Sequence, residues 1–166
     1  MSRSVQITML VNGVEHTLAV EPRMVLADVL RERFDLHSIH LGCEEGACGA
    51  CTVLVDGEPV TSCLVLAVQA GGRSITTLEG LDGDPTMTGL QASFHENFAL
   101  QCGFCTPGML VNLFSLLEER ASLSAPSEQE VRTRLNGNLC RCTGYQSIVT
   151  AALQAARSAG AGREDS

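Results

Sequence analysis

Residues 42–51 read GCEEGACGAC, and this stretch decides how the first half of the chain folds. It places the thiols of Cys43, Cys48 and Cys51 in one loop, and Cys63 follows after eleven intervening residues. The spacing, C-x4-C-x2-C-x11-C, matches the plant-type arrangement of four ligands around a 2Fe–2S cluster. Three thiolates converge on one cluster only if the backbone curls tightly, which the glycines favour because they tolerate positive φ and have no Cβ. The sequence therefore predicts a metal centre with these four cysteines as ligands.

A second group of four cysteines has a different spacing, C-x2-C-x34-C-x-C, and comprises Cys102, Cys105, Cys140 and Cys142. The first two lie between two expected helices, and the last two lie between two others. Inter-helix loops at one end of an antiparallel helical group can face each other. Helix N-termini next to both loops would direct the positive ends of their dipoles at such a site. We therefore predict a second centre with these four cysteines as metal ligands.

Zinc is the main alternative for both groups, because zinc sites made of four cysteines are common. Zinc sites usually combine two CxxC pairs, and only Cys102 and Cys105 have that spacing here. Zinc therefore stays open mainly for the second group. Disulfides are disfavoured, since the N-terminus has no apolar signal segment and cytosolic thiols stay reduced. Isolated core cysteines would seldom fall into two compact groups of four.

Composition excludes several classes of protein. The chain has 166 residues, of which 45% are hydrophobic, so one large domain or two small ones can each build a core. The net charge of −8 makes nucleic acid and anionic membranes poor partners. The apolar stretches are interrupted well short of the ~20 residues that span a bilayer, so we expect no membrane insertion. A cytoplasmic location is expected, because no export signal is visible.

The first half of the chain has the alternating pattern of strands with one helix among them. Asn12-Gly13 and Asp56-Gly57 separate alternating segments and predict two tight hairpins. The expected strands cover residues 5–11, 14–20, 52–55, 60–61 and 75–78, the expected helix covers residues 25–34, and residues 64–68 fit either state. These elements suggest a β-grasp arrangement.

Beyond a turn-rich linker at residues 81–85, the chain has the periodicity of helices. Leu90, Phe94 and Phe98 recur at every fourth residue and predict a helix with one buried face. A second helix is expected to have Thr106 as its N-cap and Pro107 as its first residue. A third helix is expected to begin at the capping box of Ser127 and Glu130 and to end at Gly137. A fourth helix is expected to cover residues 145–158, and residues 160–166 are expected to be frayed.

The expected fold class is therefore α+β. An N-terminal β-grasp, ferredoxin-like domain would cover residues 1–80, and a C-terminal four-helix bundle would cover residues 81–166. Each domain would carry one group of four cysteines.

Three longer motifs resemble one family closely. They are GCEEGACGAC at residues 42–51, QCGFCTPG at residues 101–108 and GNLCRCTGY at residues 137–145. Together they are similar to the iron–sulfur small subunit of molybdenum hydroxylases, the family of xanthine dehydrogenase, aldehyde oxidoreductase and aerobic carbon monoxide dehydrogenase. The resemblance covers residues 4–157 and lacks none of the eight cysteines. It implies two 2Fe–2S clusters, one in each domain.

The resemblance also implies partners and a path for electrons. A large subunit would carry molybdopterin, with the cytosine dinucleotide form expected, and a medium subunit would carry FAD, in a dimer of heterotrimers. This chain would relay electrons from molybdopterin through the cluster of the helical domain, then through that of the ferredoxin-like domain, to FAD or another acceptor. The substrate chemistry would belong to the large subunit, so no catalytic residue is expected in this chain and the substrate is left open.

Some single residues take roles from the resemblance. Cys142 would approach the pterin and Gln101 would form a hydrogen bond near it, so both are expected to be cofactor-binding residues. From the residues alone, Gln101 would be just a polar residue at a helix end, and this alternative stays open. Arg141 would neutralise cluster charge, contact the large subunit or stay solvated. Tyr145 is expected to be a packing residue at a helix start.

Two other functions stay open at this stage. A free, diffusible ferredoxin would need only the first half of the chain, and a zinc-bound adaptor would be colourless and lack acid-labile sulfide. Histidine could serve as a ligand in a Rieske-type centre. His16, His37, His40 and His95 lack any CxH spacing with the cysteines, so we expect surface or structural positions for all four.

Overall fold

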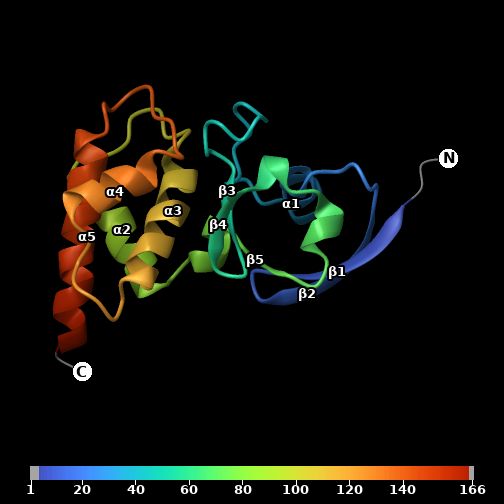
Figure 1. Ribbon diagram of the computed structural model, residues 1–166, viewed down its shortest axis with the longest axis horizontal. Coiled ribbons are helices and arrows are strands. Elements are labelled where there is room, and N and C mark those ends of the chain that lie inside the picture. Colours follow the sequence, from blue (N-terminus) through green and yellow to red (C-terminus); the bar gives the residue numbers. More distant parts are fainter. Residues whose placement is uncertain (1–3, 165–166) are drawn as a thin grey trace.

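The computed structural model describes residues 4–164 and has two parts that lie side by side (Figure 1). One part is a five-stranded sheet with a short helix, and the other consists of four helices. The expected α+β class is confirmed. Among the described residues, no helix is long and apolar enough to cross a membrane.

The sheet is built from two hairpins and one further strand, in the order β2-β1-β5-β3-β4. Its strands are β1 (Val5–Val11), β2 (Val14–Val20), β3 (Thr52–Val55), β4 (Glu58–Thr61) and β5 (Ser74–Thr76). Both turns have positive φ at both central residues, 50° and 81° at Asn12 and Gly13 and 52° and 88° at Asp56 and Gly57. This is the backbone that tight primed hairpins require, so both hairpin predictions are confirmed. Among the strand pairs of residues 4–164, only the pairing of β1 with β5 is parallel.

Helix α1 (Leu26–Phe34) packs on the sheet and closes the first core. Leu26, Val29 and Leu30 are fully buried in it, as the amphipathic pattern predicts. Cys51 and Cys63 belong to the same core. Two thiols of the first group are therefore held by the packing of the domain rather than by the loop alone.

Three short 3₁₀ helices lie where the sequence pattern predicted either a strand or a helix, or predicted a longer strand. Residues 64–68 are mostly covered by turns of this kind, Ser62–Leu64 and Ala67–Ala70. Strand β5 ends at Thr76 instead of residue 78, because the chain turns into a third 3₁₀ helix, Leu78–Leu81. The linker is correspondingly short, since Leu81 is buried and Asp84 already caps the next helix.

The second part contains α2 (Pro85–Glu96), α3 (Thr106–Glu119), α4 (Glu128–Leu135) and α5 (Gln146–Glu164). Helix α3 contacts α2, α4 and strand β3, while α2 and α4 both contact α5. These helices share one apolar core, which Leu54 of β3 also reaches. Helix α3 is therefore the main helix through which the two parts pack together (Figure 1).

Two predicted helix ends are wrong by small but informative margins. Helix α2 stops at Glu96, and Phe98 has φ 51° and is 83% exposed, so it does not continue the buried face. The amide groups of Phe98 and Ala99 donate to carbonyls of the last helical turn, which fixes this reversal. At α3, Cys105 is the N-cap and Thr106 is the first helical residue. Proline marks the first turn of a helix without fixing the cap, because several early N–H groups there lack partners.

Helix α5 extends further than predicted. It begins at Gln146 and continues to Glu164, so the tail expected to be frayed from residue 160 is helical as far as the structure describes it. Residues 165 and 166 of that expected tail lie outside the described residues.

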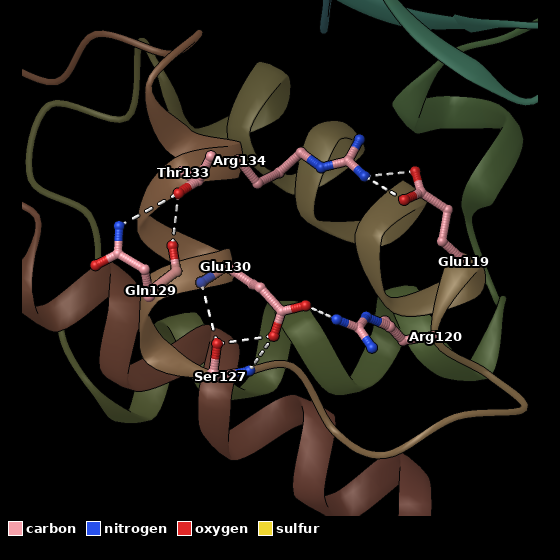
Figure 2. A network of polar contacts seen from close by, with 7 residues as sticks. All are labelled: Glu119, Arg120, Ser127, Gln129, Glu130, Thr133 and Arg134. Atoms are coloured by element: carbon pink, nitrogen blue, oxygen red, sulfur yellow. Dashed lines mark hydrogen bonds and ion pairs between the residues drawn. The ribbon is translucent and has the colours of Figure 1, made fainter.

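A network of polar contacts fixes α4 against the end of α3 (Figure 2). Ser127 and Glu130 form the predicted capping box, with Ser127 N–H donating to the Glu130 carboxylate at 2.8 Å. Glu130 also pairs with Arg120, and Arg134 pairs with Glu119 across the two helices. Because α4 leads directly into the loop with the last two cysteines, this network positions one side of the second site.

Candidate metal centres

The cysteine-bearing loops gather at one side of the molecule, the top in Figure 1, although they come from both parts of the chain. In the first loop, the N–H groups of Glu45 and Cys48 each donate to the Cys43 sulfur at 3.4 Å. These hydrogen bonds, of which the one from Glu45 contributes most and the one from Cys48 next, lower the pKa of the Cys43 thiol to about 7. Positive φ at Gly46 and Gly49 produces the curl that aims these groups at sulfur, as the glycine pattern predicts.

The other two thiols of the first group lie under this loop. Cys51 and Cys63 are both buried, and the hydroxyl of Ser62 donates to the Cys51 carbonyl at 2.7 Å. Burial raises the pKa of Cys63 to about 11, and its contact with the Cys51 thiol adds to this rise. The two thiols are therefore close neighbours in an apolar setting.

The second group is brought together from loops almost forty residues apart. The Cys102 and Cys142 sulfurs lie 3.7 Å from each other. Burial, together with the neighbouring Cys140 thiol, raises the pKa of Cys105 to about 12. Burial would also raise the pKa of Cys140, but hydrogen bonds from Thr143, whose hydroxyl lies 3.2 Å from the sulfur, lower it overall.

In both groups the thiols come in pairs. Two thiolates that share one tetrahedral metal at ~2.3 Å lie about 3.8 Å apart, which the 3.7 Å between Cys102 and Cys142 matches. Among residues 4–164, no group of three or more His, Cys, Asp or Glu side chains is arranged to hold a metal ion. Paired thiols suit a two-iron cluster, in which each iron takes two protein ligands. The pairs are Cys43 with Cys48, Cys51 with Cys63, Cys102 with Cys142, and Cys105 with Cys140.

A cavity of about 330 Å³ is lined by thiols of both groups. Cys43 and Cys48 line it from the first loop, and all four cysteines of the second group line it from the other side. Phe104 and Leu139 contribute apolar walls. The two candidate centres are thus neighbours, with little protein between them.

Direct hydrogen bonds join the loops of the two centres. Leu139 N–H donates to the Cys48 carbonyl at 2.9 Å, and the side-chain amide of Asn138 donates to the Gly49 carbonyl at 2.9 Å. Asn138 is only 2% exposed and accepts a hydrogen bond of 2.6 Å from Asn112. A Cβ on Gly108 would lie 2.3 Å from the Gly49 carbonyl, so the backbone of α3 also approaches this loop closely. The sequence gives no sign of the role of Asn138 beyond its place in a cysteine motif.

Tyr145 has a larger role than the packing role predicted for it. Its hydroxyl donates to the Asn138 carbonyl at 3.0 Å and accepts the Cys140 N–H at 2.8 Å. Its own φ of 70° places it in the left-handed region. Tyr145 therefore shapes the loop that carries Cys140 and Cys142.

The remaining predicted residues lie around the rim of the second centre or apart from it. Gln101 and Arg141 are both exposed, next to the exposed Cys102 and Cys142. Among the histidines, His16 packs on Phe34, His37 pairs with Asp35, and His95 is exposed on α2. His40 differs, because it contacts Phe104 in the loop of the other centre. Sequence reasoning missed this contact, for which no local signal exists.

Comparison with known proteins agrees with this arrangement. The family model described as a 2Fe-2S iron-sulfur cluster binding domain matches residues 9–75, and a second, described as a 2Fe-2S binding domain, matches residues 77–153. A chain with both domains is, as a class, an iron–sulfur protein with two 2Fe–2S sites.

Relatives and solved structures narrow the class. The chain is 53% identical to the nicotine 6-hydroxylase small subunit of Paenarthrobacter nicotinovorans, over 93% of this chain and 91% of the relative. It is 50% identical to caffeine dehydrogenase subunit gamma of Pseudomonas sp. (strain CBB1), over 87% of each. Quinoline 2-oxidoreductase from Pseudomonas putida 86 superposes with a TM-score of 0.86 at 50% identity, over 97% of this chain and 99% of that one.

The chain belongs to the iron–sulfur small subunits of the molybdenum hydroxylases. It is thus the electron-transfer part of an oxidoreductase complex. In aldehyde oxidoreductase from Desulfovibrio gigas, the same fold makes up only 17% of a longer chain (TM-score 0.85, 38% identity over 95% of this chain). The fold therefore occurs both as a separate subunit and as a segment of a larger protein.

Proposed function

We propose that this chain carries electrons from molybdopterin in a large subunit, through the site of its helical part and then that of its sheet part, to FAD in a medium subunit or to another acceptor. The observation that carries the proposal is the hydrogen bond between Leu139 N–H and the Cys48 carbonyl. This bond joins Cys48, a member of the first thiol group, to the residue that directly precedes Cys140 of the second group. A bound 2Fe–2S cluster supplies one-electron redox chemistry at each site.

The eight cysteines are the residues we assign as cluster ligands. The N–H groups directed at Cys43 stabilise negative charge on sulfur, and charge-assisted bonds of this kind are the stronger ones. The N-terminus of α3, directly after Cys105, adds the positive end of a helix dipole to the second site. Hydrogen bonds and dipoles of this kind tune the reduction potential of a cluster.

The domain division we infer follows from the packing. Residues 1–80 would form a β-grasp, ferredoxin-like domain, and residues 81–166 would form a four-helix bundle. Two separate apolar cores support the division, and the contacts of α2 and α4 with both α3 and α5 support the bundle.

The exposed rim of the second site is where we propose that the large subunit binds. Cys102 and Cys142 are exposed there, with Gln101 next to them, so we assign Gln101 and Cys142 as the residues that meet the pterin. Phe98, four residues from Cys102, is 83% exposed, and Leu139 is 61% exposed. Exposed apolar side chains around a functional rim are typical of protein interfaces.

We further propose that the pterin has the cytosine dinucleotide form, that a medium subunit carries FAD, and that two heterotrimers form a dimer. The names of the relatives support a complex of several subunits. Caffeine, nicotine and quinoline, which appear in the names of proteins about 50% identical, are all nitrogen heterocycles. A nitrogen heterocycle is therefore the substrate class we propose for the complex.

Metal analysis and spectroscopy of the complex test the proposed function. The purified complex is expected to contain about four iron and four acid-labile sulfide per copy of this chain. Under anaerobic conditions a nitrogen heterocycle such as quinoline should reduce both clusters, seen as two electron paramagnetic resonance signals, and an aliphatic aldehyde should not. A colourless protein with bound zinc and no sulfide would contradict the assignment, and an isolated monomer that shuttles electrons freely would indicate a diffusible ferredoxin.

A single surface substitution tests the proposed interface. Phe98→Asp is expected to abolish co-purification of the large subunit while leaving iron and sulfide unchanged, because it puts a charge where an apolar contact is needed. Its backbone already has positive φ, which aspartate tolerates better than phenylalanine, so the fold should not suffer. Leu123→Asp is the matched control, since Leu123 is 64% exposed but follows the far end of α3. Equal loss of the large subunit from both variants would contradict the assigned interface.

A further inference from the structure

The ring of Phe104 lies in the loop between Cys102 and Cys105, but its contacts are with the loop of the other centre. The ring stacks on His40, with centroids 4.8 Å apart and planes 26° from parallel. The Phe104 carbonyl accepts a hydrogen bond of 2.6 Å from His40 Nδ1. A carbonyl oxygen can only accept, so Nδ1 carries the proton.

The same ring reaches the first thiol group. A Cβ built on Gly42 would lie 3.2 Å from the edge of the Phe104 ring and 3.3 Å from the Cys48 sulfur. The ring edge and the Cys48 sulfur therefore both border the space that Gly42 leaves open because it has no Cβ. Phe104 also lines the cavity that both thiol groups share.

The partner of Phe104 is itself firmly held by the first domain. His40 N–H donates to the Ala50 carbonyl at 3.3 Å, and Arg31 of α1 donates to the Ile39 carbonyl. Ser38 donates to the Glu79 carboxylate through both its N–H and its hydroxyl, at 2.8 and 2.6 Å. Because the segment around His40 is fixed to the sheet part of the chain, the contact between His40 and Phe104 attaches the loop of the second centre to that part.

We propose that His40 and Phe104 form a clasp that sets the separation and orientation of the two thiol groups, and with them the electronic coupling between the clusters. This inference rests on the proposed function. Both residues would be positioning residues, because neither takes the place of a ligand. Phe104 is 46% exposed and His40 is only partly buried, so their contact contributes less to stability than the buried Asn138 contact does. Electron transfer and magnetic coupling, in contrast, both fall steeply with distance.

Substitutions can separate the two contacts of the clasp. His40→Phe keeps the stacked ring and removes the N–H donor, whereas His40→Asn keeps a donor near the Nδ1 position and removes the ring. Phe104→Ala removes the stacking, and Phe104→Tyr should restore it. His16→Asn is the matched control, because His16 of strand β2 makes a ring contact with Phe34 of α1 (centroids 4.7 Å), and neither residue lies in a cysteine-bearing loop.

The test is made on the purified complex after full reduction with dithionite. Low-temperature electron paramagnetic resonance measures the splitting caused by magnetic interaction between the two reduced clusters. Iron and sulfide content and the urea unfolding midpoint are measured in parallel. Phe104→Ala and His40→Phe are expected to lose the splitting while keeping both cluster signals, the metal content and the midpoint, and Phe104→Tyr and His16→Asn are expected to match the wild type.

The possible failures can be told apart. A wild-type complex without iron and sulfide would overturn the proposed function, and the clasp with it. If both clusters are present but the wild type shows no splitting, the clasp alone is overturned. The same holds if the splitting is unchanged in Phe104→Ala and His40→Phe. If Phe104→Ala lost a cluster, the two His40 variants would decide: an unchanged splitting in both overturns the clasp, and a loss in either supports it.

Discussion

Cys48→Ser is expected to stop flavin-dependent turnover while the substrate still reduces the cluster of the other domain. The Cys48 thiol pairs with Cys43, and its own N–H donates to the Cys43 sulfur. Serine keeps the backbone contacts but replaces a soft thiolate ligand with a hard oxygen, which iron–sulfur clusters rarely use. We expect turnover to fall by more than about 100-fold, which is the upper range for loss of a group that merely supports a ligand.

The measurement combines turnover with spectroscopy. The steady-state rate with a flavin-dependent acceptor should fall, iron should drop from about four to about two per chain, and one reduced cluster signal should persist after substrate is added. Cys142→Ser is the reciprocal variant. It should impair the cluster of the helical part and prevent substrate from reducing the other cluster, which should still assemble. Unchanged flavin-dependent turnover in Cys48→Ser would show that the proposed order of the relay is wrong.

The parts of the fold that the sequence predicts well are those fixed by neighbouring residues. Asn12-Gly13 sets its hairpin because positive φ at both positions is a local property. The capping box of Ser127 and Glu130 forms as expected because its partners are three residues apart. Phe98 shows the limit of this approach. Its spacing fits the buried face of α2, but the helix ends at Glu96 and the chain reverses at Phe98, whose side chain then faces solvent.

The cysteine groups are predictable from spacing, whereas the contacts between them are not. Asn138 binds the Gly49 carbonyl across 89 residues, and His40 binds the Phe104 carbonyl across 64. No periodicity or short motif encodes such distant contacts, because they depend on how two separately packed cores meet. The close approach of the two thiol groups therefore emerges only in the folded chain.

Among glycine-to-alanine substitutions in the cysteine-bearing loops, Gly49→Ala is expected to lower the free energy of unfolding most. Gly49 has φ 66°, so alanine there costs about 1–2 kcal/mol from backbone strain alone. Its Cβ would also lie 2.0 Å from the Gly137 carbonyl and 2.6 Å from the Asn138 amide, which forces the two loops apart. Separation breaks the bonds from Asn138 and Leu139, and each buried polar group left without a partner costs about 1–3 kcal/mol.

Urea unfolding of the complex, followed through the visible absorbance of the clusters, measures this cost against two matched glycines. Gly57→Ala carries the φ penalty alone, since Gly57 has φ 88° and nothing lies within 4 Å of its Cβ position. Gly137→Ala meets neither obstacle and should be neutral or slightly stabilising. Gly49→Ala should exceed Gly57→Ala by several kcal/mol and should also slow electron transfer between the clusters, because the Leu139–Cys48 bond is lost. Equal destabilisation by Gly49→Ala and Gly57→Ala would mean that the loops are not in contact, and electrons would then need another path between the two thiol groups.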